Sequence, residues 1–234
     1  CSAIPCTAST RQPITTPPAL ARHSTQRSNL TEPNLMVFFG TGQYLAAGDN
    51  FNTDQQTFYG VWDSGPSNGN LDRSNLVQQT LGTDTTNVAG QTVTIRKIST
   101  SPATSVAYVT TPEYGWYIDL PTSKERVAVT PHTIGKFVFF NTMIPSVNVC
   151  DAGGTGWLMS VNQYDGTDAT FPIIDLNADG SFDANDYVNA ATPVGIQINS
   201  IPTESRFIGN KRVTATSLGD VRFDNIQALP PSPP

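Results

Sequence analysis

Short runs of apolar, aromatic and β-branched residues recur along the chain and are separated by Gly, Pro and Asn. Residues 35–39 (LMVFF) form a continuous apolar run typical of a buried strand, and residues 91–98 (QTVTIRKI) alternate as a half-buried strand does. We expect residues 126–129 and 136–140 to form a hairpin and residues 72–80 to form a short helix. Further strands are expected at residues 57–63, 105–109, 115–120, 156–161, 196–198 and 221–223. The pattern predicts an all-β fold, either a sandwich or a propeller.

Aromatic residues beside glycines punctuate several of these strands, and three of them are Trp62, Trp116 and Trp157. Large aromatic side chains dominate the energetics of protein cores. We therefore expect the three tryptophans to anchor the core rather than to form a ligand platform. Asp63 and Asp119 end strands beside aromatic residues, and we expect both to cap turns.

The composition is typical of a turn-rich secreted β protein, with 14% charged residues, 18 Gly and 18 Pro. The net charge is −6 and the 13 basic residues form no run, so the positive stripe that nucleic-acid binding needs is missing. Asn141, Pro145 and Asn148 interrupt the longest apolar stretch, residues 137–149. We therefore predict no segment that spans a bilayer.

The most specific chemical motif is residues 175–186 (DLNADGSFDAND), with oxygen-bearing side chains at positions 1, 3, 5, 9 and 12 and glycine at position 6. Calcium takes about six to eight oxygen ligands, and short side chains at alternate positions let a tight loop surround the ion. Gly180 permits the sharp turn. The sequence predicts a calcium site, with an acidic surface turn as the alternative. The predicted ligands are Asp175, Asn177, Asp179, the backbone carbonyl of Ser181, and Asp183.

The flanks of this loop differ from those of a helix–loop–helix calcium sensor. Residues 171–174 form a short apolar run, and residues 184–191 allow only one or two helical turns. We therefore expect a static clip rather than a switch. Position 12 is Asp186 instead of Glu, and the shorter side chain reaches the ion less easily, so its role as a ligand stays open.

The three cysteines, Cys1, Cys6 and Cys150, allow one disulfide in any of three pairings and leave one thiol over. Few cysteines together with a calcium loop suit an oxidising, calcium-rich compartment. The chain begins abruptly at Cys1 without a signal peptide, and we expect it to be a mature or processed piece of a longer protein.

Other candidate chemistry is weaker. Residues 65–69 (GPSNG) match the Gly-x-Ser-x-Gly hydrolase string, but they equally form a plain turn and no strand–helix alternation surrounds them. His23 and His132 are the only histidines, and we expect His132 in a solvated hairpin loop. We therefore predict no catalytic residue, no organic cofactor and no enzyme activity.

Seven short motifs follow one another along the chain: residues 38–45 (FFGTGQYL), 58–63 (FYGVWD), 73–76 (RSNL), 115–120 (GWYIDL), 125–127 (ERV), 141–146 (NTMIPS) and 153–159 (GGTGWLM). In this order they resemble the C-terminal part of type IV pilus tip proteins, the PilY/PilC family of pilus biogenesis factors and adhesins. Residues 13–18 (PITTPP) and the position of the calcium loop add to a resemblance that covers roughly residues 11–190. It implies a modified seven-bladed β-propeller.

At about 40–45 residues per blade, 234 residues supply about four or five blades, so we expect a partial propeller. We expect its open edges to be covered by the N-terminal portion of its own precursor or by a neighbouring copy. The implied organisation is an extended N-terminal segment (1–34), propeller blades with the calcium loop (35–215), and a C-terminal strand with a Pro-rich tail (216–234).

The resemblance also implies a function. It indicates a calcium-binding protein that acts in pilus assembly and retraction control and in surface adhesion. Its partners would be minor pilins or the pilus tip and a host or abiotic surface, at the pilus tip or bacterial outer surface. The family's nine-residue site comprises the five ligands above and leaves out Asp186.

Two alternatives stay open. The first is a dockerin-like, calcium-dependent interaction module of a secreted protein, which needs two such loops where the sequence has one. The second is a quinoprotein-like propeller enzyme, for which the sequence has no adjacent cysteine pair.

Overall fold

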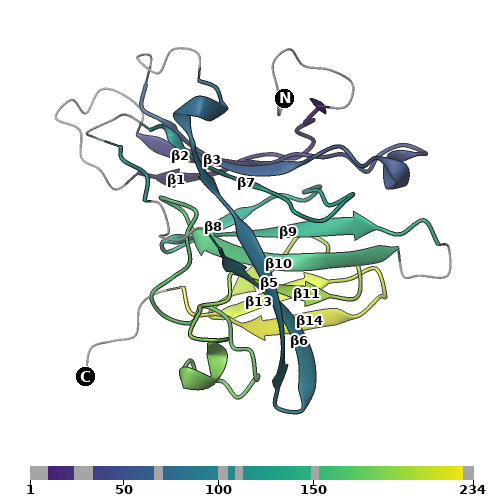
Figure 1. Cartoon of the computed structure of the whole chain (residues 1–234). Coiled ribbons are helices and arrows are strands. Elements are labelled where there is room, and N and C mark those ends of the chain that lie inside the picture. The colour runs from purple at the N-terminus through teal and green to yellow at the C-terminus, as the bar shows by residue number, and fades with distance from the viewer. Residues whose placement is uncertain are drawn as a thin grey trace.

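The structure is a computed structural model that describes residues 10–23, 34–65, 71–99, 105–108, 113–148 and 153–228 (Figure 1). Within these ranges the regular elements are strands and three short 3-10 helices, and no α-helix occurs. The 3-10 helices are η2 (Asp49–Phe51), η4 (Arg73–Asn75) and η5 (Ala184–Asp186). The prediction of an all-β fold is confirmed.

The first sheet, sheet A, has five strands in the order β1-β2-β3-β7-β4. Its strands are β1 (Ala19–Arg22), β2 (Leu35–Gly40), β3 (Thr57–Asp63), β7 (Gly115–Asp119) and β4 (Val77–Gln79). The pair of β4 and β7 is parallel, and the other pairs are antiparallel. Met36 and Phe38 on β2 are wholly buried while Val37 between them is partly exposed, so alternate side chains enter the core.

The second sheet, sheet B, has six strands in the order β5-β6-β11-β10-β9-β8. Its strands are β5 (Leu81–Val88), β6 (Gln91–Ile98), β11 (Gly195–Ile198), β10 (Gly154–Asn162), β9 (Phe137–Pro145) and β8 (His132–Ile134). β9 and β10 pair along their whole length. β5 and β6 form a long hairpin whose tip extends away from the other strands (Figure 1).

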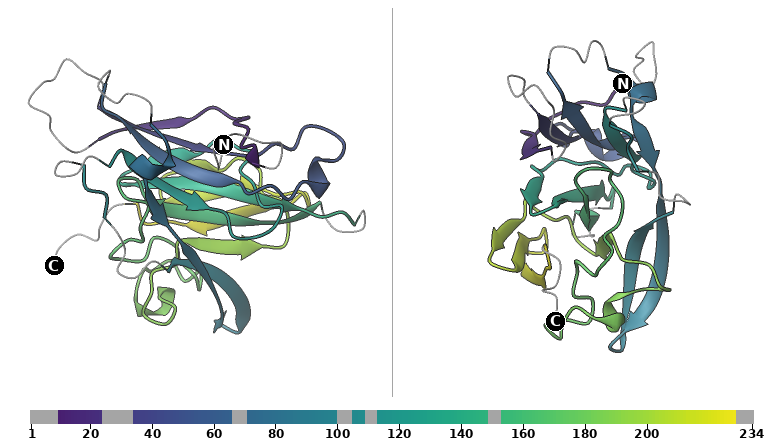
Figure 2. Two further views of the ribbon diagram at one scale, coloured as in Figure 1. Left: turned by 45° about the horizontal axis from the view of Figure 1, so that its top comes forward. Right: turned by 90° about the vertical axis from the view of Figure 1, so that its left-hand side faces the viewer.

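A third sheet, sheet C, contains β12 (Arg206–Ile208), β13 (Lys211–Ala215) and β14 (Val221–Asn225). Figure 2 shows it in yellow beside sheet B. The buried guanidinium of Arg212 donates to the backbone carbonyls of Phe140 and Met159 at 3.3 and 3.4 Å, which fastens sheet C to β9 and β10. Among the strands that the structure describes, the three sheets do not close into a ring, which is consistent with a partial propeller.

The largest core cluster lies between sheets A and B. The rings of Phe58 on β3 and Phe140 on β9 stack with centroids 3.7 Å apart. Trp62, Trp116 and Trp157 are each at most 3% exposed, which confirms the prediction that they are core residues. Aromatic pairs of this kind add about 0.5–1.5 kcal/mol to the energy of area burial.

A buried ion pair joins β6 to the segment that precedes β8. The side chains of Arg96 and Glu125 are wholly inaccessible to solvent, and their nitrogen and oxygen atoms are 2.6 and 2.7 Å apart. The hydroxyl of Thr142 donates to Glu125 at 2.6 Å, and the Arg96 guanidinium lies 3.9 Å from the centroid of the Trp157 ring. Both charges are therefore compensated inside the core.

A third buried arginine, Arg126, holds a surface loop in place. Its guanidinium donates to the backbone carbonyls of Gln43, Asp49 and Asn52 at 2.7–2.8 Å, and its Nε donates to the carbonyl of Lys124. This grip fixes the loop of residues 43–52, which has no strand of its own. The loop presents large apolar side chains to solvent: Tyr44 (42% exposed), Leu45 (81%) and Phe51 (64%).

Several local predictions are wrong. Residues 72–80 contain η4 and β4 rather than a helix, because residues 77–79 pair with β7 and this tertiary pairing outweighs local preference. Residues 105–108 form no strand. Residues 126–129 contribute one bridge, between Arg126 and Met143, and the hairpin forms instead between β8 and β9.

The division of the chain into three regions stays a prediction. β1 lies in the expected N-terminal segment and pairs with β2 along four residues, so this part is attached to sheet A. Sheet C extends across the predicted boundary between residues 215 and 216, because β13 ends at Ala215 and β14 lies beyond it.

Candidate functional site

The predicted calcium loop, residues 175–186, begins beside sheet C and ends with η5. Ile174 forms a bridge with Ile226, just beyond β14, and the backbone N–H of Asp175 donates to the carbonyl of Asn225 at 3.4 Å. These contacts attach the first residue of the loop to a strand that is about 50 residues away in sequence. Sheet C therefore determines where the loop begins.

Asp175 is the centre of the loop's hydrogen bonds and is only 6% exposed. Its Oδ1 accepts from the N–H of Asp179 at 3.2 Å, and its Oδ2 accepts from the N–H of Gly180 at 2.9 Å. The side-chain amide of Asn225 donates to the same Oδ2 at 2.6 Å. Gly180 has a φ of +86°, which glycine adopts without strain, so the backbone turns back toward this carboxylate.

The middle of the loop is a pair of side-chain turns. Asn177 Oδ1 accepts from the N–H of Asp179 at 3.1 Å, and Asp179 Oδ1 accepts from the N–H of Ser181 at 2.7 Å. The Asn177 side-chain amide also donates to Asp179 Oδ2 at 2.7 Å. The Ser181 N–H and the Asn177 amide lower the pKa of Asp179, so its carboxylate favours the charged form that binds cations.

Asp183 and Asp186 close the loop as a capping box around η5. Asp183 Oδ1 accepts from the N–H of Asn185 at 2.8 Å, and Asp186 Oδ2 accepts from the N–H of Asp183 at 3.0 Å. Asp186 Oδ1 also accepts from the N–H of Leu176 at 2.7 Å. Asp186 is wholly buried, and burial raises its pKa, to which the neighbouring Asp175 and Asp183 charges contribute. Asp186 thus ties the end of the loop to its beginning.

The loop offers the donors that calcium prefers, which are carboxylate, amide and backbone carbonyl oxygens around a glycine turn. In the parts of the chain that the structure describes, however, no group of three or more His, Cys, Asp or Glu side chains is arranged to hold a metal ion. The donor types therefore fit calcium, and calcium binding by this loop stays a prediction.

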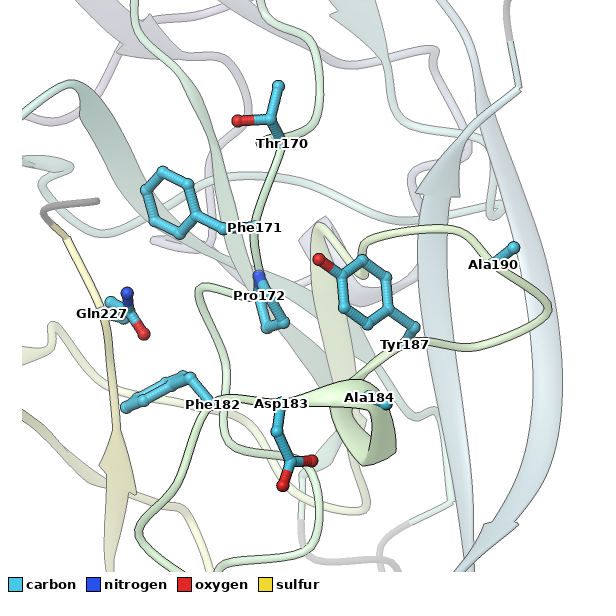
Figure 3. Close-up of a pocket in the computed structure, with 9 residues that line it drawn as sticks. All are labelled: Thr170, Phe171, Pro172, Phe182, Asp183, Ala184, Tyr187, Ala190 and Gln227. Carbon is cyan, nitrogen blue, oxygen red and sulfur yellow. The ribbon is translucent and has the colours of Figure 1, made fainter. Parts of the chain in front are cut away.

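A cleft of about 810 Å³ adjoins the loop (Figure 3). We call it the aromatic cleft, and its lining residues are Thr170, Phe171, Pro172, Phe182, Asp183, Ala184, Tyr187, Ala190 and Gln227. Sequence reasoning missed it, because the lining comes from the segment before the loop, from the loop and η5, and from the chain beyond β14. The aromatic residues that flank the acidic motif were the one available signal.

Comparison with known proteins identifies relatives of this chain. A family model described as the PilY1 beta-propeller domain matches residues 1–93. The chain is 30% identical over 208 residues to the type IV pilus biogenesis factor PilY1 of Pseudomonas aeruginosa (strain UCBPP-PA14). The crystal structure of the Pseudomonas aeruginosa PilY1 C-terminal domain superimposes with a TM-score of 0.73 at 26% identity, over 94% of this chain and 46% of that one. The chain belongs to the PilY1 family.

The chain corresponds to a small share of its PilY1 relatives. The match to the Pseudomonas protein covers 80% of this chain and 17% of the relative. A PilY1 homolog of Xylella fastidiosa (strain Temecula1 / ATCC 700964) is 34% identical over 143 residues, which is 56% of this chain and 9% of that protein. These relatives are named as pilus biogenesis factors rather than as enzymes. The resemblance to the C-terminal part of the family is confirmed.

Other residues that the sequence singled out lie in varied surroundings. Asp63 accepts from the N–H of Gly65 at 3.0 Å, as expected of a turn cap, but Asp119 pairs with Arg73 at 2.6 Å. His132 begins β8, with its Nε2 3.0 Å from Glu204, so the prediction of a solvated loop is wrong.

Some predictions fall outside the ranges that the structure describes. The three cysteines and residues 66–69 of the hydrolase-like string lie there. Where the structure describes the chain, no helix is long and apolar enough to cross a membrane.

Proposed function

We propose that this chain is part of a type IV pilus-associated protein that acts in pilus assembly and retraction control and in surface adhesion. The main support for this proposal is the structural similarity of the chain to the PilY1 C-terminal domain, which extends over 94% of this chain. This likeness favours the pilus role over the dockerin-like module and the propeller enzyme. The proposed location is the pilus tip or bacterial outer surface, with minor pilins and the N-terminal portion of the same precursor as partners.

We further propose that the loop binds calcium through Asp175, Asn177, Asp179, the Ser181 carbonyl and Asp183. A bound divalent cation would neutralise carboxylates that otherwise repel one another. The chain's own residues prepare the loop for this role. The N–H groups of Asp179 and Gly180 orient the Asp175 carboxylate, and those of the closing turn fix Asp186.

Calorimetric titration of calcium into the purified chain tests the metal proposal. Asp179→Asn replaces a charged carboxylate ligand by a neutral amide, so we expect calcium affinity to fall by at least about tenfold. The fold should persist, because the Asp179 side chain is exposed. Asp220→Asn is the matched control, because Asp220 is an exposed aspartate in a turn outside the loop. Equal calcium affinity in both variants would refute the site.

Complementation tests the pilus role. We expect deletion of the gene to reduce surface pili in the native bacterium, wild type to restore them, and Asp179→Asn to restore them with altered extension or retraction. Unchanged piliation after deletion would contradict the proposed role even if calorimetry confirms calcium binding.

A further inference from the structure

The aromatic cleft is a candidate ligand site that adjoins the proposed calcium loop and shares one residue, Asp183, with the proposed metal ligands. Figure 3 shows the rings of Phe171 and Tyr187 on either side of Pro172, with Phe182 below them. Pro172 is buried, whereas the three aromatic side chains are partly exposed. The cleft therefore presents aromatic faces around an apolar floor and remains open to solvent.

Three separate parts of the chain hold the walls of the cleft in place. Phe171 packs edge-on against the buried Phe137 of β9, with ring centroids 5.8 Å apart. Phe182 lies inside the loop, between the turn at Asp179 and the start of η5. The backbone N–H of Gln227 donates to the carbonyl of Ile173 at 2.9 Å, which fixes the third wall beside Pro172. The cleft is thus largely formed without a ligand.

The polar groups of the cleft include two hydrogen-bond donors and one carboxylate. Across the described ranges, no hydrogen bond involves the Tyr187 hydroxyl or the Gln227 side-chain amide, and both groups can donate. The nine lining residues include one carboxylate, the exposed Asp183, and no Lys, Arg or His. The nearby Asp175 and Asp179 add negative charge, which one divalent cation would not fully cancel.

We propose that the aromatic cleft binds a proline-rich segment of a partner protein that carries Arg or Lys beside its prolines. A polyproline II helix makes no internal hydrogen bonds, so its carbonyls can accept from Tyr187 and Gln227. Its proline rings pack against aromatic side chains, as they do in other aromatic-lined grooves. The basic residue complements Asp183 and the acidic loop. This inference does not depend on the proposed pilus role.

Fluorescence anisotropy tests the proposal with the whole chain and a labelled synthetic decapeptide that contains two Pro-x-x-Pro repeats after an N-terminal Arg. We expect saturable binding, a loss of at least tenfold in affinity for Tyr187→Ala, and a loss of about 2- to 10-fold for Tyr187→Phe, which removes one hydrogen-bond donor. Phe223→Ala is the matched control, because this aromatic residue is 65% exposed on β14 outside the cleft.

Two further arms define the ligand. Replacing the peptide's Arg by Gln should weaken binding several-fold, and that difference should shrink at high salt. Binding should persist in a calcium chelator, so failure of the metal proposal leaves this test intact. Circular dichroism and thermal melting establish that each variant is folded. If Tyr187→Ala does not fold, Tyr187→Phe and Gln227→Ala carry the test.

Several results would overturn the proposal. One is the absence of peptide binding at millimolar concentration, and another is equal affinity for the cleft variants and Phe223→Ala. A preference for the uncharged peptide LPPSPP, the sequence of residues 229–234, would assign the cleft to the chain's own tail. Self-association that Tyr187→Ala abolishes in sedimentation velocity would assign it to a second copy.

Discussion

Replacement of Glu125 by Gln is expected to be strongly destabilising, because the charge of Arg96 would then be buried without its partner. Both side chains are wholly inaccessible, and both Glu125 oxygens bind the guanidinium. Removal of one partner of a buried pair costs about 3–5 kcal/mol. The Thr142 hydroxyl also donates to Glu125, so we expect a loss near the upper end of that range. Typical domains have only about 5–15 kcal/mol of unfolding free energy in total.

Urea unfolding followed by tryptophan fluorescence measures this loss, with the midpoint falling at an unchanged m value. The matched control is Asp84→Asn, which breaks the Asp84–Lys97 pair, whose two side chains are 26% and 29% exposed. This control should cost less than about 1 kcal/mol. A double variant, Arg96→Met with Glu125→Leu, should recover much of the lost stability, because apolar groups of similar volume avoid the desolvation penalty.

The reasoning fails if Glu125→Gln costs no more than Asp84→Asn, or if the double variant is less stable than Glu125→Gln alone. Either result would mean that solvent or another group compensates Arg96. Strong dependence of the loss on salt concentration would point to the same conclusion, since buried pairs are weakly screened.

Three further predictions concern other sites. Gly60→Ala should lower the free energy of unfolding by about 1–3 kcal/mol in urea titration, because a Cβ there would lie 2.5 Å from Trp116, and an unchanged midpoint would contradict it. Asn225→Ala should weaken calcium binding about 10- to 100-fold in calorimetry by releasing Asp175 Oδ2, provided that the loop binds calcium. Hydrogen bonds from Gln43 and from two backbone N–H groups lower the pKa of Asp49 to about 2, from 3.8. At this position the folded protein therefore binds fewer protons than the unfolded protein, and the free energy of unfolding should fall as the pH drops from about 4 to 2. The Asp49→Ala variant should lose less of its unfolding free energy over the same pH range.

The sequence predicted the strands with the clearest hydrophobic signal. Apolar runs or apolar–polar alternation correctly predicted five strands, because one or both faces of each strand enter the core. These strands are β2, β3, β6, β7 and β10. β5 (LGTDTTNV) escaped detection because its side chains are mostly polar and partly exposed. It is a strand because all of its residues pair with β6, and composition does not reveal such pairing.

In the candidate site, too, the sequence predicted the local structure but not the long-range contacts. The spacing of residues 175–186 predicted a tight acidic loop, and the structure contains one with Gly180 at the turn. Spacing alone did not reveal that Asn225 holds Asp175 or that Gln227 lines the aromatic cleft. Both depend on contacts between segments that are about 50 residues apart, which only the folded arrangement brings together.

The grip of Arg126 on residues 43–52 has a consequence for how this surface can change over time. The arginine binds backbone carbonyls, and every amino acid supplies that group. Replacement of the protruding Tyr44 or Leu45 would therefore alter the chemistry of the loop without loosening its conformation. Natural variation can therefore change which side chains this face of the molecule presents, while Arg126 preserves the conformation of the loop.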